Sequence, residues 1–238
     1  VWTGFDYIGE PTPYGWPARS SYFGIVDLAG FPKDVYYLYK SEWTDEPVLH
    51  LFPHWNWNPG QEVDLWCYYN NADEVELFVN GVSQGVRAKT KDCLHTMWRT
   101  VYEPGTIEVV AYKDGKEVSR NTRHTAGEPA QIRLVMEQHG EGPDDDDIAF
   151  ASVEILDKDG NLCPSAENQV SFELEGDSAF IAGVDNGNPI SMERFKDNKR
   201  KAFYGKCLVV LQADKAGKTV LKATSPGLEP AEVIFKTR

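Results

Sequence analysis

The first residues whose types suggest chemistry are two carboxylates near the start of the chain. Asp6 and Glu10 are the acidic side chains of the segment VWTGFDYIGEP. Two carboxylates that work together as acid/base and nucleophile lie about 5–5.5 Å apart. Residues four apart in an extended segment are separated by roughly 13 Å. We therefore expect Asp6 to hydrogen-bond its neighbours at a strand end, rather than to form a catalytic pair with Glu10.

Histidines and tryptophans gather in the stretch LHLFPHWNW. His50 and His54 are four residues apart in a β pattern, which again places them roughly 13 Å apart and predicts no metal site. Trp55 and Trp57 allow two interpretations. Their faces could form a platform for sugar rings, or they could pack at a junction between two parts of the chain. We favour the junction, because large aromatic side chains commonly dominate such interfaces.

Two acidic stretches suggest calcium, which prefers several oxygen ligands. The run DDDD at 144–147 follows Gly142 and Pro143 and is expected to be a solvated loop. The stretch DKDGN at 157–161 lacks a downstream Glu and is better explained as a hairpin turn. The segment GVDNGNP at 183–189 predicts a tight turn between strands, because Asn, Asp and Gly tolerate positive φ. The sequence therefore predicts no metal and no cofactor.

The four cysteines are far apart in the sequence and form no Cys-x-x-Cys pair. This spacing disfavours a zinc site. Isolated buried thiols are the favoured interpretation, and the disulfide state is left open. The cysteines are Cys67, Cys93, Cys163 and Cys207.

The elements that must position these residues are mainly β-strands. From about residue 46, short segments alternate apolar and polar residues, as in EVDLWCYY and QVSFELEG. Asn80-Gly81 and Asp114-Gly115 predict two-residue hairpin turns. Strands at this spacing predict two immunoglobulin-like β-sandwiches. We place them at 47–126 and 127–238, separated by a linker that contains Gly127 and Pro129.

The first 46 residues have a different pattern. VWTGFDYI predicts a buried strand, a Gly/Pro-rich loop follows, and FPKDVYYLYKSEW predicts a helix with Pro32 in its first turn. Val35, Leu38 and Tyr39 would share one face of this helix. A single strand and helix cannot bury both of their faces. We expect this segment to be one repeat of a larger α/β layer, and the chain, which begins without Met inside an apolar run, to be part of a longer protein.

Composition limits the classes of partner. The 238 residues carry a formal net charge of −13, which argues against nucleic acid, since binding phosphates requires Lys and Arg. The same charge disfavours an anionic membrane surface. No apolar run approaches the roughly 20 residues that span a bilayer. The chain is thus expected to bind neither nucleic acid nor membrane.

The opening segment resembles the end of the catalytic barrel in family 2 glycoside hydrolases, and most of all the β-galactosidases of Bacteroides-type bacteria. Trp2 and Asp6 fall on the family's Val-Trp-x-x-x-Asp at the last barrel strand, and Gly24-Ile25-Val26 falls on the approach to the last barrel helix. PVLHLFPHWNW resembles the start of the sandwich that follows the barrel. AGVDNGNP lies in a segment that resembles the family's last domain.

This resemblance implies a mainly β chain, in which residues 1–46 are the last strand, loop and helix of a (β/α)8 barrel and two sandwiches follow. It implies the C-terminal part of a retaining β-galactosidase that acts on a β-galactoside or polysaccharide. The family's two catalytic glutamates would precede Val1, so the isolated chain should be inactive. Trp2 and Asp6 would contact substrate, since barrel active sites lie at the carboxyl ends of strands.

Several alternatives stay open on the sequence alone. The resemblance implies a periplasmic or secreted bacterial location, and it leaves homo-oligomer formation open. β-Glucuronides and β-mannosides remain alternative substrates, because specificity depends on loops outside these residues. The rival interpretation is a non-catalytic pair of immunoglobulin-like modules that binds glycans or acts in adhesion.

Overall fold

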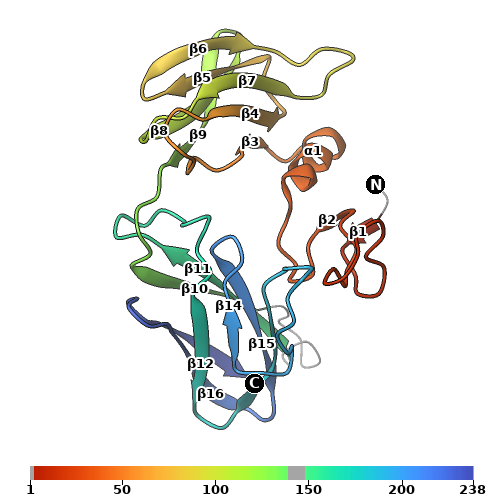
Figure 1. The fold of residues 1–238 in the computed structure, drawn as a ribbon, viewed down its shortest axis with the longest axis vertical. Coiled ribbons are helices and arrows are strands. Elements are labelled where there is room, and N and C mark those ends of the chain that lie inside the picture. The colour runs from red at the N-terminus through yellow and green to blue at the C-terminus, as the bar shows by residue number, and fades with distance from the viewer. Residues whose placement is uncertain (1–2, 139–147, 238) are drawn as a thin grey trace. The chain divides into compact units, whose positions relative to one another are not determined.

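The structure, a computed structural model, describes residues 3–138 and 148–237. Within these ranges the chain is mainly β, with seventeen strands and one helix (Figure 1). Its contacts divide it into two compact units. The two-segment unit consists of Val1–Phe31 and Ala126–Arg238, and the helix-containing unit is Pro32–Thr125. This division falls inside the predicted 1–46 segment, whose assignment as one part of a barrel stays a prediction.

In the helix-containing unit, two antiparallel sheets share one apolar core. One sheet has the order β3-β4-β7 and the other β6-β5-β8-β9. The strands of the first sheet are β3 (Leu49–Phe52), β4 (Glu62–Tyr69) and β7 (Thr96–Val101). Those of the second are β5 (Glu74–Val79), β6 (Val82–Arg87), β8 (Thr106–Lys113) and β9 (Lys116–His124). The core draws Leu65 and Trp98 from one sheet and Leu77 and Val109 from the other, so each sheet buries one face, as the alternating pattern predicts.

Both predicted hairpin turns are confirmed. Asn80 and Gly81 join β5 to β6 with φ of 49° and 79°. Asp114 and Gly115 join β8 to β9 with φ of 51° and 70°. Two successive residues at positive φ give the turn the twist that flanking strands need. Strand β7 was not predicted.

The helix α1 (Asp34–Trp43) confirms the helical prediction for FPKDVYYLYKSEW. It begins at Asp34, two residues after Pro32, because Lys33 takes the extended N-cap conformation. Pro32 therefore lies before the helix and not in its first turn, where the sequence predicted it. Asp34 in the first turn and Lys40 in the last turn both complement the helix dipole. The helix packs against β3 and β4.

The two-segment unit also has two antiparallel sheets around one core. Their orders are β10-β11-β15-β13 and β14-β12-β16-β17. The first comprises β10 (Gln131–Gln138), β11 (Ile148–Leu156), β13 (Ala179–Asp185) and β15 (Lys206–Ala213). The second comprises β12 (Gln169–Glu175), β14 (Lys199–Lys201), β16 (Gly217–Thr224) and β17 (Ala231–Thr237). Val153 and Val209 from one sheet share the core with Phe172 and Phe235 from the other.

The opening segment of this unit holds a short parallel pair. β1 (Thr3–Phe5) pairs with β2 (Gly24–Val26) in the register Thr3↔Gly24 and Phe5↔Val26. The prediction of a buried strand is wrong for these residues, since Phe5 is 64% exposed. The reason is that this sheet has two strands only among the described residues, too few to bury a face.

The cysteines differ in exposure, and all four are free thiols. Cys67, Cys163 and Cys207 are buried, as the sequence suggested, whereas Cys93 is half-buried. Burial raises the pKa of the Cys67 thiol to about 12 and that of the Cys163 thiol to about 11. Burial also raises the pKa of Cys207.

We expect iodoacetamide at pH 8 to label Cys93 in the folded chain and to leave the three buried thiols unmodified. The reactive species is the thiolate, which burial disfavours and shields. Peptide mapping by mass spectrometry would measure the labelling, with the urea-unfolded chain as the control in which all four react. Modification of Cys207 in the native chain at the rate of Cys93 would contradict this expectation.

Candidate functional site

Of the two residues predicted to contact substrate, the structure describes only Asp6. Trp2 lies outside the described residues. Asp6 directly follows β1 and is 8% exposed. Its Oδ1 accepts hydrogen bonds from the Gly24 backbone nitrogen at 2.9 Å and from the Ser21 hydroxyl at 3.4 Å. Asp6 thus ties the end of β1 to the start of β2. Glu10 is exposed and accepts a hydrogen bond from the Tyr7 hydroxyl.

A close approach of two backbones accompanies this link. A Cβ atom added to Gly24 would lie 2.2 Å from the Asp6 nitrogen and 2.3 Å from the Phe5 carbonyl carbon. Any side chain at this position would therefore force β1 and β2 apart. Glycine at 24 allows the parallel pairing that places Asp6 beside Ser21.

The stretch GVDNGNP, residues 183–189, contains the end of β13 and the first residues of a longer loop, residues 186–198, between β13 and β14. Asp185 Oδ1 accepts from the Asn186 nitrogen at 2.7 Å, and Asn186 Oδ1 accepts from the Asn188 nitrogen at 3.0 Å. Such side-chain bonds to the following backbone are why Asn and Asp form turns. The prediction of a turn is confirmed at its start. The stretch lies between two strands as predicted, but the connection is longer than a tight turn, because the chain runs on to Lys199 before β14 begins.

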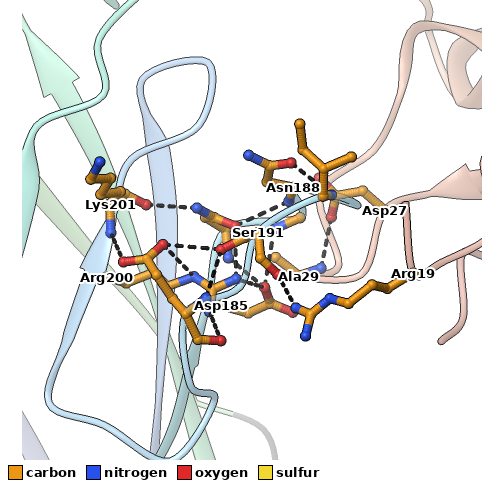
Figure 2. Close-up of polar contacts among 12 residues, drawn as sticks. Arg19, Asp27, Ala29, Asp185, Asn188, Ser191, Arg200 and Lys201 are labelled. Atoms are coloured by element: carbon orange, nitrogen blue, oxygen red, sulfur yellow. Dashed lines mark hydrogen bonds and ion pairs between the residues drawn. The ribbon is translucent and has the colours of Figure 1, made fainter. Parts of the chain in front are cut away.

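The loop folds around a buried guanidinium. Arg200 is 0% exposed, and its Nη2 donates to Asp185 Oδ1 and to Asn186 Oδ1, both at 3.0 Å. Its Nη1 donates to the Glu193 carbonyl at 3.4 Å, and Glu193 Oε2 lies 3.6 Å from its Nε. The guanidinium also lies over the Phe195 ring at 5.3 Å. Figure 2 shows the polar contacts around Arg200, with Asp185 beside it.

The opposite side of the 186–198 loop bonds to the opening segment. The Arg19 backbone nitrogen donates to the Pro189 carbonyl at 3.0 Å, and its Nη2 donates to the Ser191 carbonyl. Residues more than 160 positions apart in the chain are thereby joined (Figure 2). We call this set of contacts, from Arg19 to Arg200 through the loop, the loop joint.

The loop joint includes a second close approach, between Asp27 and Gly187. Asp27 Oδ1 accepts from the backbone nitrogens of Ala29 and Phe31, both at 2.9 Å. Its Oδ2 lies 2.1 Å from where a Cβ on Gly187 would be. Gly187 has φ of 73°, so both the backbone conformation and the space require glycine.

The aromatic stretch LHLFPHWNW serves the helix-containing unit internally. Trp55 is 1% exposed in the core and donates from Nε1 to the Glu103 carbonyl at 3.1 Å. Trp55 therefore fills the core and neither offers its face to a sugar ring nor lies at a junction. The favoured prediction of a junction residue is wrong for Trp55. Trp57 packs partly buried against the same core and stacks on His54. His50 stacks on Tyr37 at 3.8 Å.

The stretches that the sequence analysis considered for metal binding form no cluster of metal ligands in the part of the chain that the structure describes. Within residues 3–138 and 148–237 no three His, Cys, Asp or Glu side chains are grouped so that they could hold an ion. The run at 144–147 lies outside these residues. No helix of the described residues is long and apolar enough to cross a membrane.

The stretch DKDGN forms the predicted turn, with Asp157 as its centre. The buried Asp157 carboxylate accepts from the Asp159 and Asn161 nitrogens and from Gly127 nitrogen, at 2.8 to 2.9 Å. The Asn161 side chain adds a fourth bond at 3.1 Å. Burial alone would raise the pKa of Asp157, but these hydrogen bonds outweigh it and lower the pKa to about 2.

We expect Asp157→Asn to lower the free energy of unfolding by about 1 to 2 kcal/mol at pH 7, after allowance for solvent screening at the turn. The folded pKa lies below the ordinary value of 3.8. The stabilisation is therefore complete above that value and is lost as the pH falls toward 2. Urea unfolding at pH 7 and pH 3 would measure it, with Asp159→Asn as the control. An effect that grows on acidification would contradict the assignment.

Sequence reasoning did not find Arg200, Arg19 or Asp27. Arg200 stands in the basic run NKRKAF, which is typical of a solvated surface. The feature that distinguishes Arg200 is the alternation of exposed and buried side chains along β14. Lys199 and Lys201 are exposed, whereas Arg200 is buried and pairs across the ladder with the buried Val170. Nothing local in the sequence links Arg19 or Asp27 to a loop so far along the chain.

Comparison with protein-family models gives two matches. Residues 132–234 match the glycoside hydrolase family 2 C-terminal domain 5. Residues 60–119 match a domain of unknown function, DUF4982. The two matches fall in the two-segment unit and the helix-containing unit, respectively.

Similar proteins are glycoside hydrolases. The chain is 68% identical over 232 residues to beta-galactosidase BoGH2A of Bacteroides ovatus, covering 97% of this chain and 27% of that protein. It is 40% identical to a putative beta-glucuronidase of Formosa agariphila, over 89% of this chain and 21% of the relative. The chain thus spans about a quarter of the length of these relatives.

A solved structure agrees. A beta-glycosidase from Bacteroides vulgatus superposes with a TM-score of 0.89 and 37% identity, over 99% of this chain and 30% of that one. The resemblance read from the opening segment is thereby confirmed for the chain. By these matches the chain belongs to glycoside hydrolase family 2, and residues 132–234 are the C-terminal domain 5 of that family.

Proposed function

We propose that this chain is the C-terminal part of a retaining β-galactosidase, an enzyme that hydrolyses terminal β-D-galactosyl residues of carbohydrates. The observation that carries the proposal is the 68% identity, across 97% of the chain, to a protein named beta-galactosidase. The relative named putative beta-glucuronidase is 40% identical. A β-galactoside is therefore the substrate that we favour over a β-glucuronide.

The parallel pair β1-β2 supports the placement of residues 1–46 at the edge of a catalytic (β/α)8 barrel. Parallel sheets occur almost only with both faces covered, whereas Phe5 in β1 is 64% exposed. Further strands and helices of a barrel would cover it. On this proposal β1 is the last barrel strand, the residues after it form a loop at the active-site mouth, and α1 is the last barrel helix.

The paired sheets in each unit support two immunoglobulin-like sandwiches, at 47–126 and 127–238. Their proposed role is that of a scaffold. The loop joint supports this role, because Arg19 and Asp27 of the opening segment contact the 186–198 loop. The last sandwich would hold the barrel edge through these contacts.

The proposal assigns no catalytic residue to these 238 positions. Retaining hydrolysis needs an acid/base and a nucleophile, and the two glutamates would lie upstream of Val1. Trp2 and Asp6 are the substrate contacts that we propose. Asp6 directly follows the carboxyl end of β1, where barrel sites are built, and Trp2 is proposed from the resemblance alone. The apolar face of Trp2 would pack on the C–H face of the sugar.

Two further parts of the proposal rest on the resemblance alone. They are a periplasmic or secreted location and assembly into a homo-oligomer. The rival function, a non-catalytic glycan-binding or adhesion module, loses one of its supports because Trp55 is buried in the core rather than available to stack on glycans.

The test compares the 238-residue chain with the complete protein encoded by its gene. We expect the complete protein to hydrolyse nitrophenyl β-galactoside at least tenfold faster than nitrophenyl β-glucuronide. The 238-residue chain should show no turnover above a heat-denatured control. Turnover by the chain alone, or a preference for the glucuronide, would contradict the proposal. Calorimetric binding of a galactan by the inactive chain would favour the rival function.

A further inference from the structure

A cavity of about 320 Å³ lies within the helix-containing unit, lined by α1, the approach to β3, and β9. Small-molecule sites start at about this size. The side chains of Tyr37, Lys40, His50, Asn121 and Arg123 are among those that line it. No carboxylate is among the lining residues, although the chain as a whole carries a net charge of −13.

Arg123 is the residue that makes this cavity unusual. Its Nε donates to the Leu51 carbonyl at 2.6 Å. In the described part of the chain its two terminal nitrogens have no hydrogen-bond partner and its guanidinium forms no ion pair. Burial lowers the pKa of Arg123, and the nearby carboxylate of Asp34 partly offsets this effect. A partly desolvated guanidinium with free donors favours an anion.

The other ionisable groups leave the cavity basic. Lys40 Nζ pairs with Glu46 at 2.6 Å, but the Glu46 side chain is 69% exposed and so is an exchangeable surface partner. His50 Nε2 lies 2.7 Å from Asp34 Oδ1. Asp34 and Glu46 do not line the cavity themselves. The cationic side chains of the lining are therefore Lys40 and Arg123.

We propose that this cavity binds a compact oxyanion, a carboxylate or phosphate group of a small molecule, with Arg123 as its main donor and Lys40 as the second cation. The planar guanidinium can donate two parallel hydrogen bonds to either group. Asn121 and Tyr37 border the same space and would meet hydroxyl groups attached to the anion. All the residues that line the cavity belong to the helix-containing unit.

The matched control for Arg123 is Arg120, on the same strand. Arg120 pairs with Glu117 at 2.8 Å and also with Glu108. It has the same side chain as Arg123 but its charge is already compensated. Arg120→Gln should therefore leave anion binding within twofold of the unaltered chain.

The experiment is a calorimetric titration of the 238-residue chain at low ionic strength with sodium glucuronate, inorganic phosphate and glucose. We expect at least one anion to bind with a Kd of about 1 mM or tighter, and glucose not to bind. Arg123→Gln should weaken binding about tenfold, the loss of a charge-assisted pair. Added salt should weaken it as well. Comparison of the two anions identifies the preferred group.

Lys40→Met provides a second variant, because it removes the other cation that lines the cavity. It should weaken binding about threefold even if Arg123→Gln impairs folding, which thermal melting would reveal. The proposal is overturned if neither anion binds the unaltered chain below about 20 mM. It is equally overturned if Arg120→Gln weakens binding as much as Arg123→Gln or Lys40→Met does.

Discussion

Arg200→Met is expected to lower the free energy of unfolding of the two-segment unit by about 3 kcal/mol. Removing one member of a buried ionic network leaves its partners without compensation, which typically costs 3–5 kcal/mol. Here the side chains of Asp185 and Glu193 are 14% and 28% exposed, so water recovers part of the loss. The substituted Met fills a similar volume, so the effect reports the lost polar contacts more than a cavity.

The measurement should report on this unit alone. Amide hydrogen exchange of peptides from β12 and β15 gives the free energy of opening for the sheets around Arg200. The control is Arg133→Met, since Arg133 pairs with Glu154 while its own side chain is 53% exposed. Exposed pairs contribute at most about 1 kcal/mol. Equal effects of the two substitutions would show that the loop is not held through Arg200.

Local chemistry explains which parts of the fold could be predicted from the sequence. The turns at Asn80-Gly81 and Asp114-Gly115 require positive φ at two successive residues. The types of these two adjacent residues are enough to predict each turn. The helix at FPKDVYYLYKSEW is likewise specified by its own residues. Such elements depend on short-range sterics and alternation, and the structure confirms them.

The parts that could not be predicted depend on contacts between distant segments. Trp55 has the same residue type whether it stacks on a sugar, lies at a junction or fills a core. Only the packing of two sheets around it makes it 1% exposed. The burial of Arg200 could not be predicted for the same reason. The groups that bury it come from the 186–198 loop, whose conformation cannot be predicted from its residues alone.

Gly187→Ala is the second substitution for which we expect a large effect, about 2 to 4 kcal/mol on the two-segment unit. A Cβ at a φ of 73° costs about 1 kcal/mol in backbone strain. The rest comes from the Asp27 carboxylate, whose Oδ2 lies 2.1 Å from the new atom. Gly227 is the matched control, because it has φ of 80° with no atom within 4 Å of its Cβ position. Gly227→Ala should cost about 1 kcal/mol.

A double-mutant cycle separates the two causes. With Asp27→Ala in the background, Gly187→Ala should cost no more than Gly227→Ala, because the colliding carboxylate is gone. Hydrogen exchange in peptides from residues 3–31 would show whether the opening segment detaches from the 186–198 loop. If the cost of Gly187→Ala is unchanged by Asp27→Ala, the close approach does not position the segment. If the cost falls, the segment that we propose to carry the substrate contacts depends on a glycine about 180 residues along the chain, and the complete enzyme should lose activity with Gly187→Ala while its catalytic groups stay intact.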